Sequence, residues 1–402
     1  MELLYIAQYQ FELKNGRFFT RPAYGNAFWE KYLEFFSTIH IMGIKLRSKS
    51  NKIGLIPITN DKITVELIPE NIHPKDLKYD GIIKRALDER IKKAEAIILK
   101  PDSRKGIMAI ALAEKYKVPY MIEMTGDFYS HLRTQDNPLI RVYSHILYYQ
   151  VHRAIRNCEF GLYVTKEYLQ RIYPIKGEQC GCSDVIIPDP SSEALSQRIK
   201  RINDSQRNNC FKLGLVGGYR NKRKGIDTAI KALRLVATCK LELHILGSGT
   251  EEDRIRWYEY AEKNGVKDKL FFDGSLLSSS EVLSWYDSID IIILPSRSEG
   301  LPRCIVEAQS RGCPCITSNV CGLPELVDIS WTHDQGDYSR LADLIIEMTS
   351  DESQMKKAAE TNFKRSKGYT KDLLEKTRRD FFCRYLKYIE VNAEKRVETI
   401  TK

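Results

Sequence analysis

Two glutamates with seven residues between them lie where a predicted strand passes into a predicted helix. The apolar run Ile291–Leu294 is typical of a buried strand, Glu299 lies in the following loop, and the helix begins at Pro302. Gly312 ends that helix, which puts Glu307 about one and a half turns inside it, roughly 7 Å from its start. Amides at such a start lack acceptors and lie at the positive end of the helix dipole, which suits a phosphate group. One carboxylate could reach a group beside the phosphate, and the other a sugar hydroxyl below it.

The amides expected to hold this phosphate belong to Gly300, Leu301 and Arg303. The run Cys313–Thr317 begins another strand, so the segment is a strand–helix–strand unit. An ordinary amphipathic helix with two solvated glutamates is the alternative interpretation, because Glu-x7-Glu is a common spacing by itself. The order of strand, loop, Gly-Leu-Pro and terminating glycine favours the phosphate site.

A second loop that suits phosphate follows the predicted strand Lys212–Val216. Gly217 and Gly218 open this loop, and four of the five positions from 220 to 224 are basic, ending at Lys224. In an open parallel sheet, ligands bind outside the carboxyl ends of the strands, so these cations should face the same crevice as the first phosphate site. Two convergent elements are a more specific signal than either alone.

The spacing Glu299-x7-Glu307, with Gly-Leu-Pro after the first glutamate and Lys224-Gly225 upstream, resembles the signature of retaining glycosyltransferases of family 4 (glycosyl transferases group 1), which have the GT-B fold. The resemblance implies that Glu299 lies beside the donor sugar and that Glu307 accepts hydrogen bonds from the ribose of the nucleotide. It also implies that Lys224 and an arginine contact the donor diphosphate. It is strong over roughly residues 210–330, and the first half of the chain shares only architecture and short phrases.

The family's arginine position is occupied here by Gly218, so its role is carried over to Arg220 or Arg223, and the choice stays open. The residues that the resemblance implies for donor binding are Gly217, Gly218, Arg223, Gly300, Leu301, Pro302, Arg303 and Glu307. The residues that it implies for catalysis are Lys224, Arg220, Glu299 and Asp127.

Asp127 follows the predicted buried strand Tyr120–Met124 in the first half of the chain. Members of the family often carry a His or an acidic residue near this strand end, so we expect Asp127 to touch sugar hydroxyls, with a helix cap as the alternative. The phrases Glu-x-x-Gly-Asp and Tyr163–Pro174 look like those of a bacterial capsular or exopolysaccharide subgroup. The family's Gly-Gly loop after the first strand is missing, since Gln8–Tyr24 contains only Gly16.

The sequence predicts neither a metal nor a cofactor. Metal-dependent glycosyltransferases hold a cation on the diphosphate with an Asp-x-Asp pair, and the chain contains none. Leu246–Gly249 carries only a lone Gly-x-Gly, which is typical of a tight strand–helix turn rather than of a dinucleotide site. The formal net charge is +10, with clusters at Lys45–Lys52 and Arg220–Lys224, but no nucleic-acid motif accompanies it, so we expect no nucleic-acid partner.

Strand-like runs alternate with helical periodicity along most of the chain, which predicts an α/β protein with parallel sheets. Together with the resemblance, this gives two Rossmann-like domains that face a cleft. The acceptor side is residues 1–205, the donor side is residues 206–369, and a helix at about 370–402 crosses back to the first domain. The polar segment Ser191–Asn209 is interpreted as the linker.

We expect a cytoplasmic protein. The start of the chain lacks the basic residues and cleavage site of a signal peptide, and no apolar run is long enough to span a bilayer. The ten cysteines are interpreted as reduced. One predicted helix is rich in aromatic residues that should face the core, although its exposed edge could rest on the inner face of a membrane; these residues are Phe28, Trp29, Tyr32, Phe35 and Phe36.

These observations predict a retaining, metal-independent hexosyltransferase that moves a sugar from a nucleotide-diphosphate donor to a glycan or lipid-linked oligosaccharide acceptor. Bacterial surface polysaccharide synthesis is the expected setting. The alternatives are a sugar-nucleotide epimerase or phosphorylase of the same fold and a non-catalytic partner subunit that binds nucleotide sugar. An epimerase would act on the nucleotide sugar without an acceptor, whereas an inactive subunit would bind nucleotide and turn over nothing.

Overall fold

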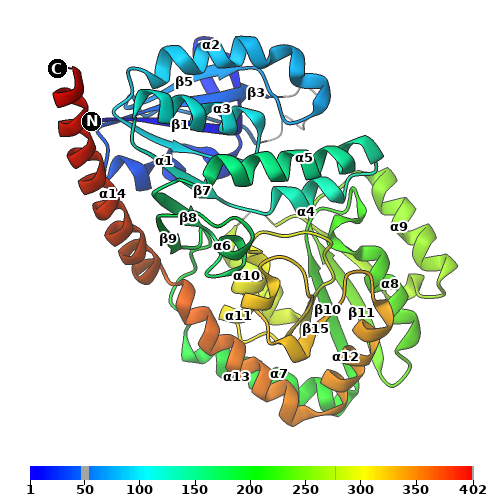
Figure 1. Cartoon of the computed structure of the whole chain (residues 1–402). Helices are drawn as coiled ribbons and strands as arrows, with labels where there is room; N and C mark the ends of the chain where they lie inside the picture. The colour runs from blue at the N-terminus through cyan, green and yellow to red at the C-terminus, as the bar shows by residue number, and fades with distance from the viewer. Residues whose placement is uncertain (47–53, 277, 401–402) are drawn as a thin grey trace. The chain divides into compact units, whose positions relative to one another are not determined.

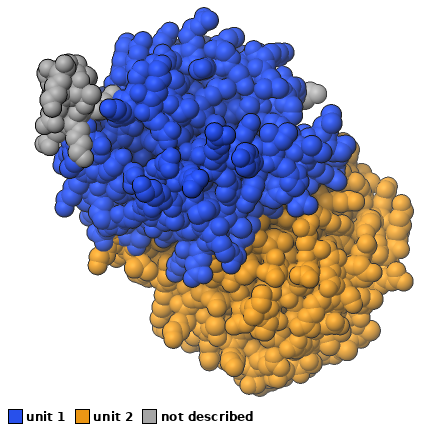
Figure 2. Space-filling view, viewed as in Figure 1, with its two compact units in different colours: residues 1–182, 377–402 blue, residues 183–376 orange. Residues whose placement is uncertain are grey.

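A computed structural model describes residues 1–46, 54–276 and 278–400, with side chains described to residue 393, and it contains two compact units (Figure 2). Unit 1 combines Met1–Cys182 with Thr377–Lys402, and unit 2 is Ser183–Lys376. Each unit is built around its own sheet, and parallel pairing dominates in both, which confirms the predicted α/β class. That the two domains face a cleft stays a prediction.

The sheet of unit 1 runs in the order β4-β2-β1-β6-β7-β8-β9, and β3 lies between β1 and β5. The strands are β1 (Glu2–Lys14), β2 (Arg17–Thr20), β3 (Thr38–Lys45), β4 (Ile56–Pro57), β5 (Ile63–Ile68), β6 (Ala96–Leu99), β7 (Tyr120–Met124), β8 (Phe160–Tyr163) and β9 (Glu178–Gly181). The amino half of β1 pairs in parallel with β3 and β6, and its carboxyl half forms an antiparallel hairpin with β2. Asn15 and Gly16, both with positive φ, make the turn of this hairpin.

The helices of unit 1 pack on both sides of its sheet, and α3 packs against α2 and α5 (Figure 1). They are η1 (Pro22–Tyr24), α1 (Asn26–Leu33), η2 (Pro74–Tyr79), α2 (Asp80–Ile91), α3 (Arg104–Tyr116), α4 (Phe128–Arg133), α5 (Pro138–Ile155), α6 (Tyr168–Ile172) and, from Thr377 on, α14 (Lys371–Ile400). The hairpin occupies the place where the family has its Gly-Gly loop. The signal for it in the sequence was Asn15-Gly16 between two apolar runs.

Aromatic residues of α1 and of the turn that follows it pack within unit 1. Trp29 and Tyr32 are fully buried, and Phe35 stacks on Phe382 of α14 with ring centroids 4.8 Å apart. The hydroxyl of Tyr385, also on α14, donates to the carbonyl oxygen of Ile97 at 2.8 Å. The core-facing interpretation of the aromatic helix therefore holds, and we do not retain this helix as a membrane contact.

The sheet of unit 2 is entirely parallel in the order β12-β11-β10-β13-β14-β15. Its strands are β10 (Cys210–Val216), β11 (Lys240–Leu246), β12 (Leu270–Gly274), β13 (Ile291–Leu294), β14 (Cys315–Ser318) and β15 (Thr332–His333). The carboxyl ends of all six strands therefore lie at one edge of the sheet. Loops after β10, β11 and β13 meet at this edge, and two of them carry the predicted phosphate sites.

Helices α8, α9 and α12 cover one face of this sheet, and α7, α10, α11 and α13 cover the other (Figure 1). The bounds are α7 (Ser192–Asn208), η3 (Lys222–Lys224), α8 (Ile226–Leu235), α9 (Glu251–Lys263), η4 (Lys267–Lys269), α10 (Ser279–Ser288), α11 (Arg303–Ser310), η5 (Leu323–Glu325), η6 (Ile329–Trp331), α12 (Tyr338–Ser350), α13 (Glu352–Ser366) and η7 (Lys367–Tyr369).

The predicted linker Ser191–Asn209 is wrong, because this segment is helix α7. Ala194 and Ile202 are buried in unit 2, and the buried guanidinium of Arg198 donates to three backbone carbonyl oxygens there. The apolar periodicity of the sequence did not reveal the buried face of α7, because one of the buried positions on that face is an arginine. The compact units accordingly divide after Cys182, whereas the predicted division was after residue 205.

Within the described residues, no helix combines the length and the apolar character that crossing a bilayer requires.

The cysteines are all free thiols, and burial raises the pKa of several of them, to about 12 at Cys158 and Cys304. The basic cluster Lys45–Lys52 lies mostly outside the described residues.

Candidate functional site

The loop after β10 and the loop after β11 touch at the carboxyl edge of the sheet of unit 2. The amide of Gly217 donates to the carbonyl of Leu246 at 2.9 Å, and the amide of Tyr219 donates to the carbonyl of Ser248 at 3.1 Å. A Cβ on Gly247 would lie 2.2 Å from the carbonyl oxygen of Gly217, so no side chain fits there. The Gly-x-Gly segment is thus a tight strand–helix turn, as expected, and it supports the basic loop.

The turn η3 presents the basic side chains and is held against the loop after β13. Gly225 has φ of +70°, and a Cβ on it would lie 1.8 Å from the carbonyl oxygen of Pro295. The amide of Arg297 donates to the carbonyl of Arg223 at 2.8 Å, and its guanidinium pairs with Asp227 at 2.7 Å. Sequence reasoning missed Arg297, and its place three residues after the end of β13 was the available signal. The two predicted phosphate elements are therefore adjacent parts of one structure.

Lys224 and Glu299 form a buried ion pair between these elements. The ammonium nitrogen of Lys224 lies 2.6 Å from Oε1 of Glu299, and each residue is only 8% exposed. Ser296 donates to the same carboxylate oxygen at 2.7 Å, and the side chain of Lys224 lies over Gly217, where a Cβ would meet it at 2.6 Å. Burying two charges is costly unless both are paired, and here they are.

The structure distinguishes the two arginines that the sequence left open. A guanidinium nitrogen of Arg223 lies 3.9 Å from Oε2 of Glu299, at the edge of ion-pair range. Arg220 is exposed, and its carbonyl accepts from Arg256 of α9 at 2.9 Å. Burial raises the pKa of the Asp253 carboxyl, but its hydrogen bonds with Thr250 and the nearby cations Arg256 and Arg220 outweigh this effect and lower the pKa.

Helix α11 begins at Arg303, one residue later than predicted, because Pro302 is the extended residue that precedes its first turn. Gly300 and Leu301 lead into this start, where amides lack acceptors within the helix. Glu307 lies one turn further, 3.8 Å from the guanidinium of Arg303, and the hydroxyl of Tyr286 donates to it at 3.3 Å. Burial raises the pKa of the Glu307 carboxyl, although Arg303 and Tyr286 oppose the shift.

Asp127 belongs to unit 1 and caps helix α4. Its carboxylate accepts from the amides of Tyr129 and Ser130 and from the hydroxyls of Tyr168 and Tyr173, at 2.6 to 3.2 Å. The residue is 5% exposed. Four donors occupy its oxygens, so the helix cap, which the sequence left as the alternative, is its structural role, and we withdraw it from the catalytic set.

Unit 1 has a polar edge of its own, at the carboxyl ends of β6 and β7, that the sequence did not reveal. Lys100 donates to the hydroxyl of Thr125 at 2.7 Å, and its ammonium lies 4.7 Å from the ring centroid of Tyr9. The buried Lys105 donates to the carbonyl oxygens of Ala7 and Met42. Burial lowers the pKa of Lys105 to about 7 against the opposing pull of nearby carboxylates.

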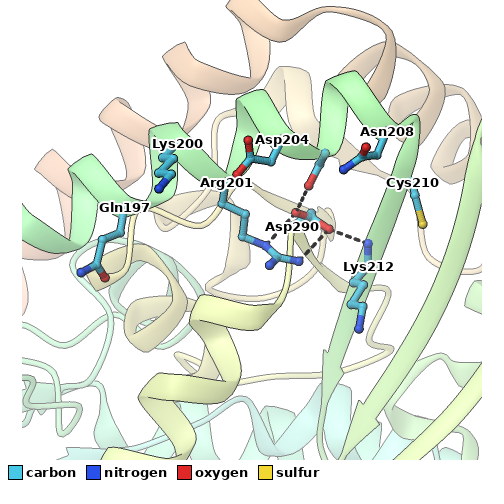
Figure 3. A pocket seen from close by; sticks show the side chains of 9 residues that line it. Gln197, Lys200, Arg201, Asp204, Asn208, Cys210, Lys212 and Asp290 are labelled. Carbon is cyan, nitrogen blue, oxygen red and sulfur yellow. Dashed lines mark hydrogen bonds and ion pairs between the residues drawn. The ribbon is translucent and has the colours of Figure 1, made fainter.

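A pocket also opens at the opposite, amino-terminal edge of the sheet of unit 2 (Figure 3). Asp290, just before β13, is satisfied there by Arg201 at 2.8 Å, by the hydroxyl of Ser205 at 2.6 Å and by the amide of Lys212 at 2.7 Å. These bonds join α7 to β10 and β13. None of the predicted site residues lines this pocket. The carboxylate of Asp290 has a structural role there.

The second unit matches a known family. Residues 210–351 match the family model described as glycosyl transferases group 1. The chain is 25% identical over 395 residues to Protein CapJ of Staphylococcus aureus, covering 97% of each chain. Over 125 residues, 31% of this chain and 33% of the relative, it is 33% identical to the O-antigen biosynthesis glycosyltransferase WclY of Escherichia coli.

Solved structures share the fold across the whole chain. Sucrose-phosphate synthase from Thermosynechococcus elongatus superposes with a TM-score of 0.66 at 13% identity, covering 96% of this chain and 99% of that one. Anabaena HepE in complex with UDP gives 0.65 at 13% identity, covering 95% of this chain and 100% of that one. The GT-B fold is thereby confirmed. Lys224, Glu299 and Glu307 all fall within the matched segment 210–351.

Proposed function

We propose that this enzyme transfers a sugar from a nucleotide-diphosphate donor to a glycan or lipid-linked acceptor in surface polysaccharide synthesis, because residues 210–351 match the family model described as glycosyl transferases group 1. The buried pair of Lys224 and Glu299 carries the proposal, since it lies between the two elements that suit phosphate. The similarity to CapJ over 97% of the chain and to WclY over 125 residues supports the polysaccharide setting.

The donor diphosphate would bind at the start of α11, against the amides of Gly300, Leu301 and Arg303. Lys224 would then be shared between a phosphate oxygen and Glu299, and Arg223 would add a second cation. Glu299 holds the ammonium in place in the free protein and would lie beside the donor sugar when the donor is bound. Glu307, further along α11, would accept hydrogen bonds from the ribose hydroxyls.

In the transfer itself, the bond between the anomeric carbon and the diphosphate oxygen breaks, and the acceptor hydroxyl oxygen bonds to that carbon. In a retaining reaction the acceptor enters from the face that the diphosphate leaves, and the departing diphosphate can take the hydroxyl proton. Lys224 and Arg223 would stabilise the negative charge that develops on the leaving group, in the role that a metal has in enzymes with Asp-x-Asp. Cytoplasmic nucleotide sugars would supply the donor.

Ligand binding is tested with a panel of nucleoside diphosphates in a thermal-shift assay. The cognate nucleotide should stabilise the protein by about 2.7 kcal/mol at a hundredfold excess over its Kd, and EDTA should leave the shift unchanged. No shift with UDP, GDP, ADP, CDP or dTDP at millimolar concentration would contradict the proposal. Turnover without an acceptor would favour the epimerase, and binding without any turnover would favour the inactive subunit.

Catalysis is tested with Lys224→Ala, with Lys222→Ala as its control in the same turn. Removing Lys224 should lower turnover by about 10²–10³ at saturating donor and acceptor, whereas the exposed Lys222 should matter little. Since Lys224→Ala leaves Glu299 buried and unpaired, Lys224→Met with Glu299→Gln removes both charges and should keep unit 2 folded. Full turnover in that double variant, or a requirement for magnesium in the wild type, would refute the metal-free mechanism.

A further inference from the structure

Helix α5 of unit 1 exposes a stripe of large apolar side chains. Leu139, Val142, Ile146 and Tyr149 are 72%, 64%, 52% and 67% exposed. Their spacing of three, four and three residues puts them on one face of the helix. The opposite face is buried, through residues that include Leu147, and anchors the helix to unit 1. Isolated exposed apolar residues are common on protein surfaces, but four on the same face of one helix form an apolar patch of the kind that binds a partner.

The charged residues of this helix segment all have one sign. Residues 137–158 include Arg141, Arg153 and Arg156 and contain no Asp or Glu. At 100° per residue, Arg153 and Arg156 fall in line with the apolar stripe at its carboxyl end. On the neighbouring helix α4, Arg133 is also exposed. The nearest acidic residues in sequence, Asp136 and Glu159, lie beyond the two ends of this segment.

We infer that this face of α5, defined by Leu139, Val142, Ile146, Tyr149 and Arg153, docks the protein on an anionic lipid bilayer surface. An apolar face with basic and aromatic residues can enter the boundary between headgroups and acyl chains, while the arginines reach the lipid phosphates. A second copy of the chain fits less well, because this helix segment offers no carboxylate to the arginines of a partner helix. The inference extends the proposed function, since a lipid-linked acceptor would lie at such a surface.

The experiment is co-sedimentation of the full chain with vesicles of phosphatidylglycerol and phosphatidylethanolamine, without donor or acceptor. We expect binding to these vesicles, weaker binding to phosphatidylcholine vesicles, and a loss in high salt. Leu139→Gln with Ile146→Gln should lower the partition coefficient by at least about tenfold. The matched control is Leu77→Gln with Ile82→Gln, since these unit 1 residues are each 59% exposed and lie outside α5.

Charge is tested separately with Arg153→Gln and Arg156→Gln, which should reduce binding to anionic vesicles and leave the melting temperature unchanged. Wild-type protein that does not bind the anionic vesicles, or α5 variants that bind as well as the wild type, would overturn the inference. A wild-type dimer in sedimentation velocity that the α5 substitutions dissociate, without vesicle binding, would make the face a self-interface instead. None of these outcomes depends on donor binding, so a negative result leaves the proposed function intact.

Discussion

At the scale of single residues, the site is organised by a pair of opposite charges rather than by one reactive group. Lys224 and Glu299 neutralise each other in the free protein at 2.6 Å, with the hydroxyl of Ser296 as a further donor to the carboxylate. Such a pair adds little to stability compared with apolar residues of the same size. Its presence at the edge of the sheet is explained best by a ligand that needs a fixed cation.

The two arginines near the site should differ in their effect on the donor. Arg223→Ala should weaken donor binding by about 1.5–3 kcal/mol, because its guanidinium approaches Glu299, whereas Arg220→Ala should change it little. Isothermal titration with the cognate nucleoside diphosphate measures both. A larger loss for Arg220→Ala would return the role of the missing family arginine to that residue.

Glu307 should make nucleotide binding depend on pH. Burial raises its pKa, so in the free protein it takes up a proton at a higher pH than an exposed glutamate. Because ribose hydroxyls would donate to the carboxylate, affinity should be complete above this raised pKa and should fall as the pH drops through it. Near that pKa, titration in two buffers of different ionisation enthalpy should show proton release on binding. Glu307→Gln should bind more weakly and without this dependence; an unchanged pH profile would contradict the assignment.

At the scale of elements, the site depends on how closely the turn η3 approaches the loop after β13. Gly225 permits this approach in two ways: its φ is positive, and it has no Cβ to strike the carbonyl of Pro295. The salt bridge of Arg297 with Asp227 then holds the loop to the first turn of α8. Neither element alone would bring Lys224 to Glu299.

Gly225→Ala should therefore destabilise unit 2 and weaken nucleotide binding together. Gly265→Ala is the matched control, since Gly265 has φ of +72° but a Cβ added there would meet no other atom within 4 Å. The control should lower the free energy of unfolding by about 1–2 kcal/mol, because alanine is strained in the left-handed backbone conformation. Gly225→Ala should lower it by more than about 3 kcal/mol, because the clash with Pro295 adds to this strain. Chemical denaturation measures both; equal losses would mean that the turn moves away at no cost.

At the scale of the whole molecule, the chain returns to its starting unit at its end. Helix α14 begins in unit 2 and from Thr377 on belongs to unit 1, where Phe381, Phe382 and Tyr385 are fully buried. Its aromatic side chains pack against α1 and the sheet of unit 1. This part of α14 therefore belongs to the core of unit 1, and removing one of its buried side chains should destabilise unit 1.

Phe382→Ala should lower the free energy of unfolding by about 3–5 kcal/mol, because removing this large buried side chain leaves a cavity against α1. Val391→Ala on the same helix, at a residue 50% exposed, should cost little. Hydrogen exchange should show faster exchange in α1 and the unit 1 sheet, while the amides of β10 to β14 keep their protection. Equal loss in both units would show that they unfold together.

The sequence by itself determined the alternation of strands and helices, because this depends on local periodicity. Short motifs and their spacing carried the resemblance to the group 1 glycosyltransferases, and that resemblance made Lys224, Glu299 and Glu307 candidates for the site. The tertiary structure decided what depends on contacts between distant segments. Asp127 caps a helix and accepts hydrogen bonds from two tyrosines. The expected linker is helix α7, which includes the buried Arg198. Arg223, rather than Arg220, lies near Glu299. A polar side chain's partner is set by packing, which a sequence pattern does not contain.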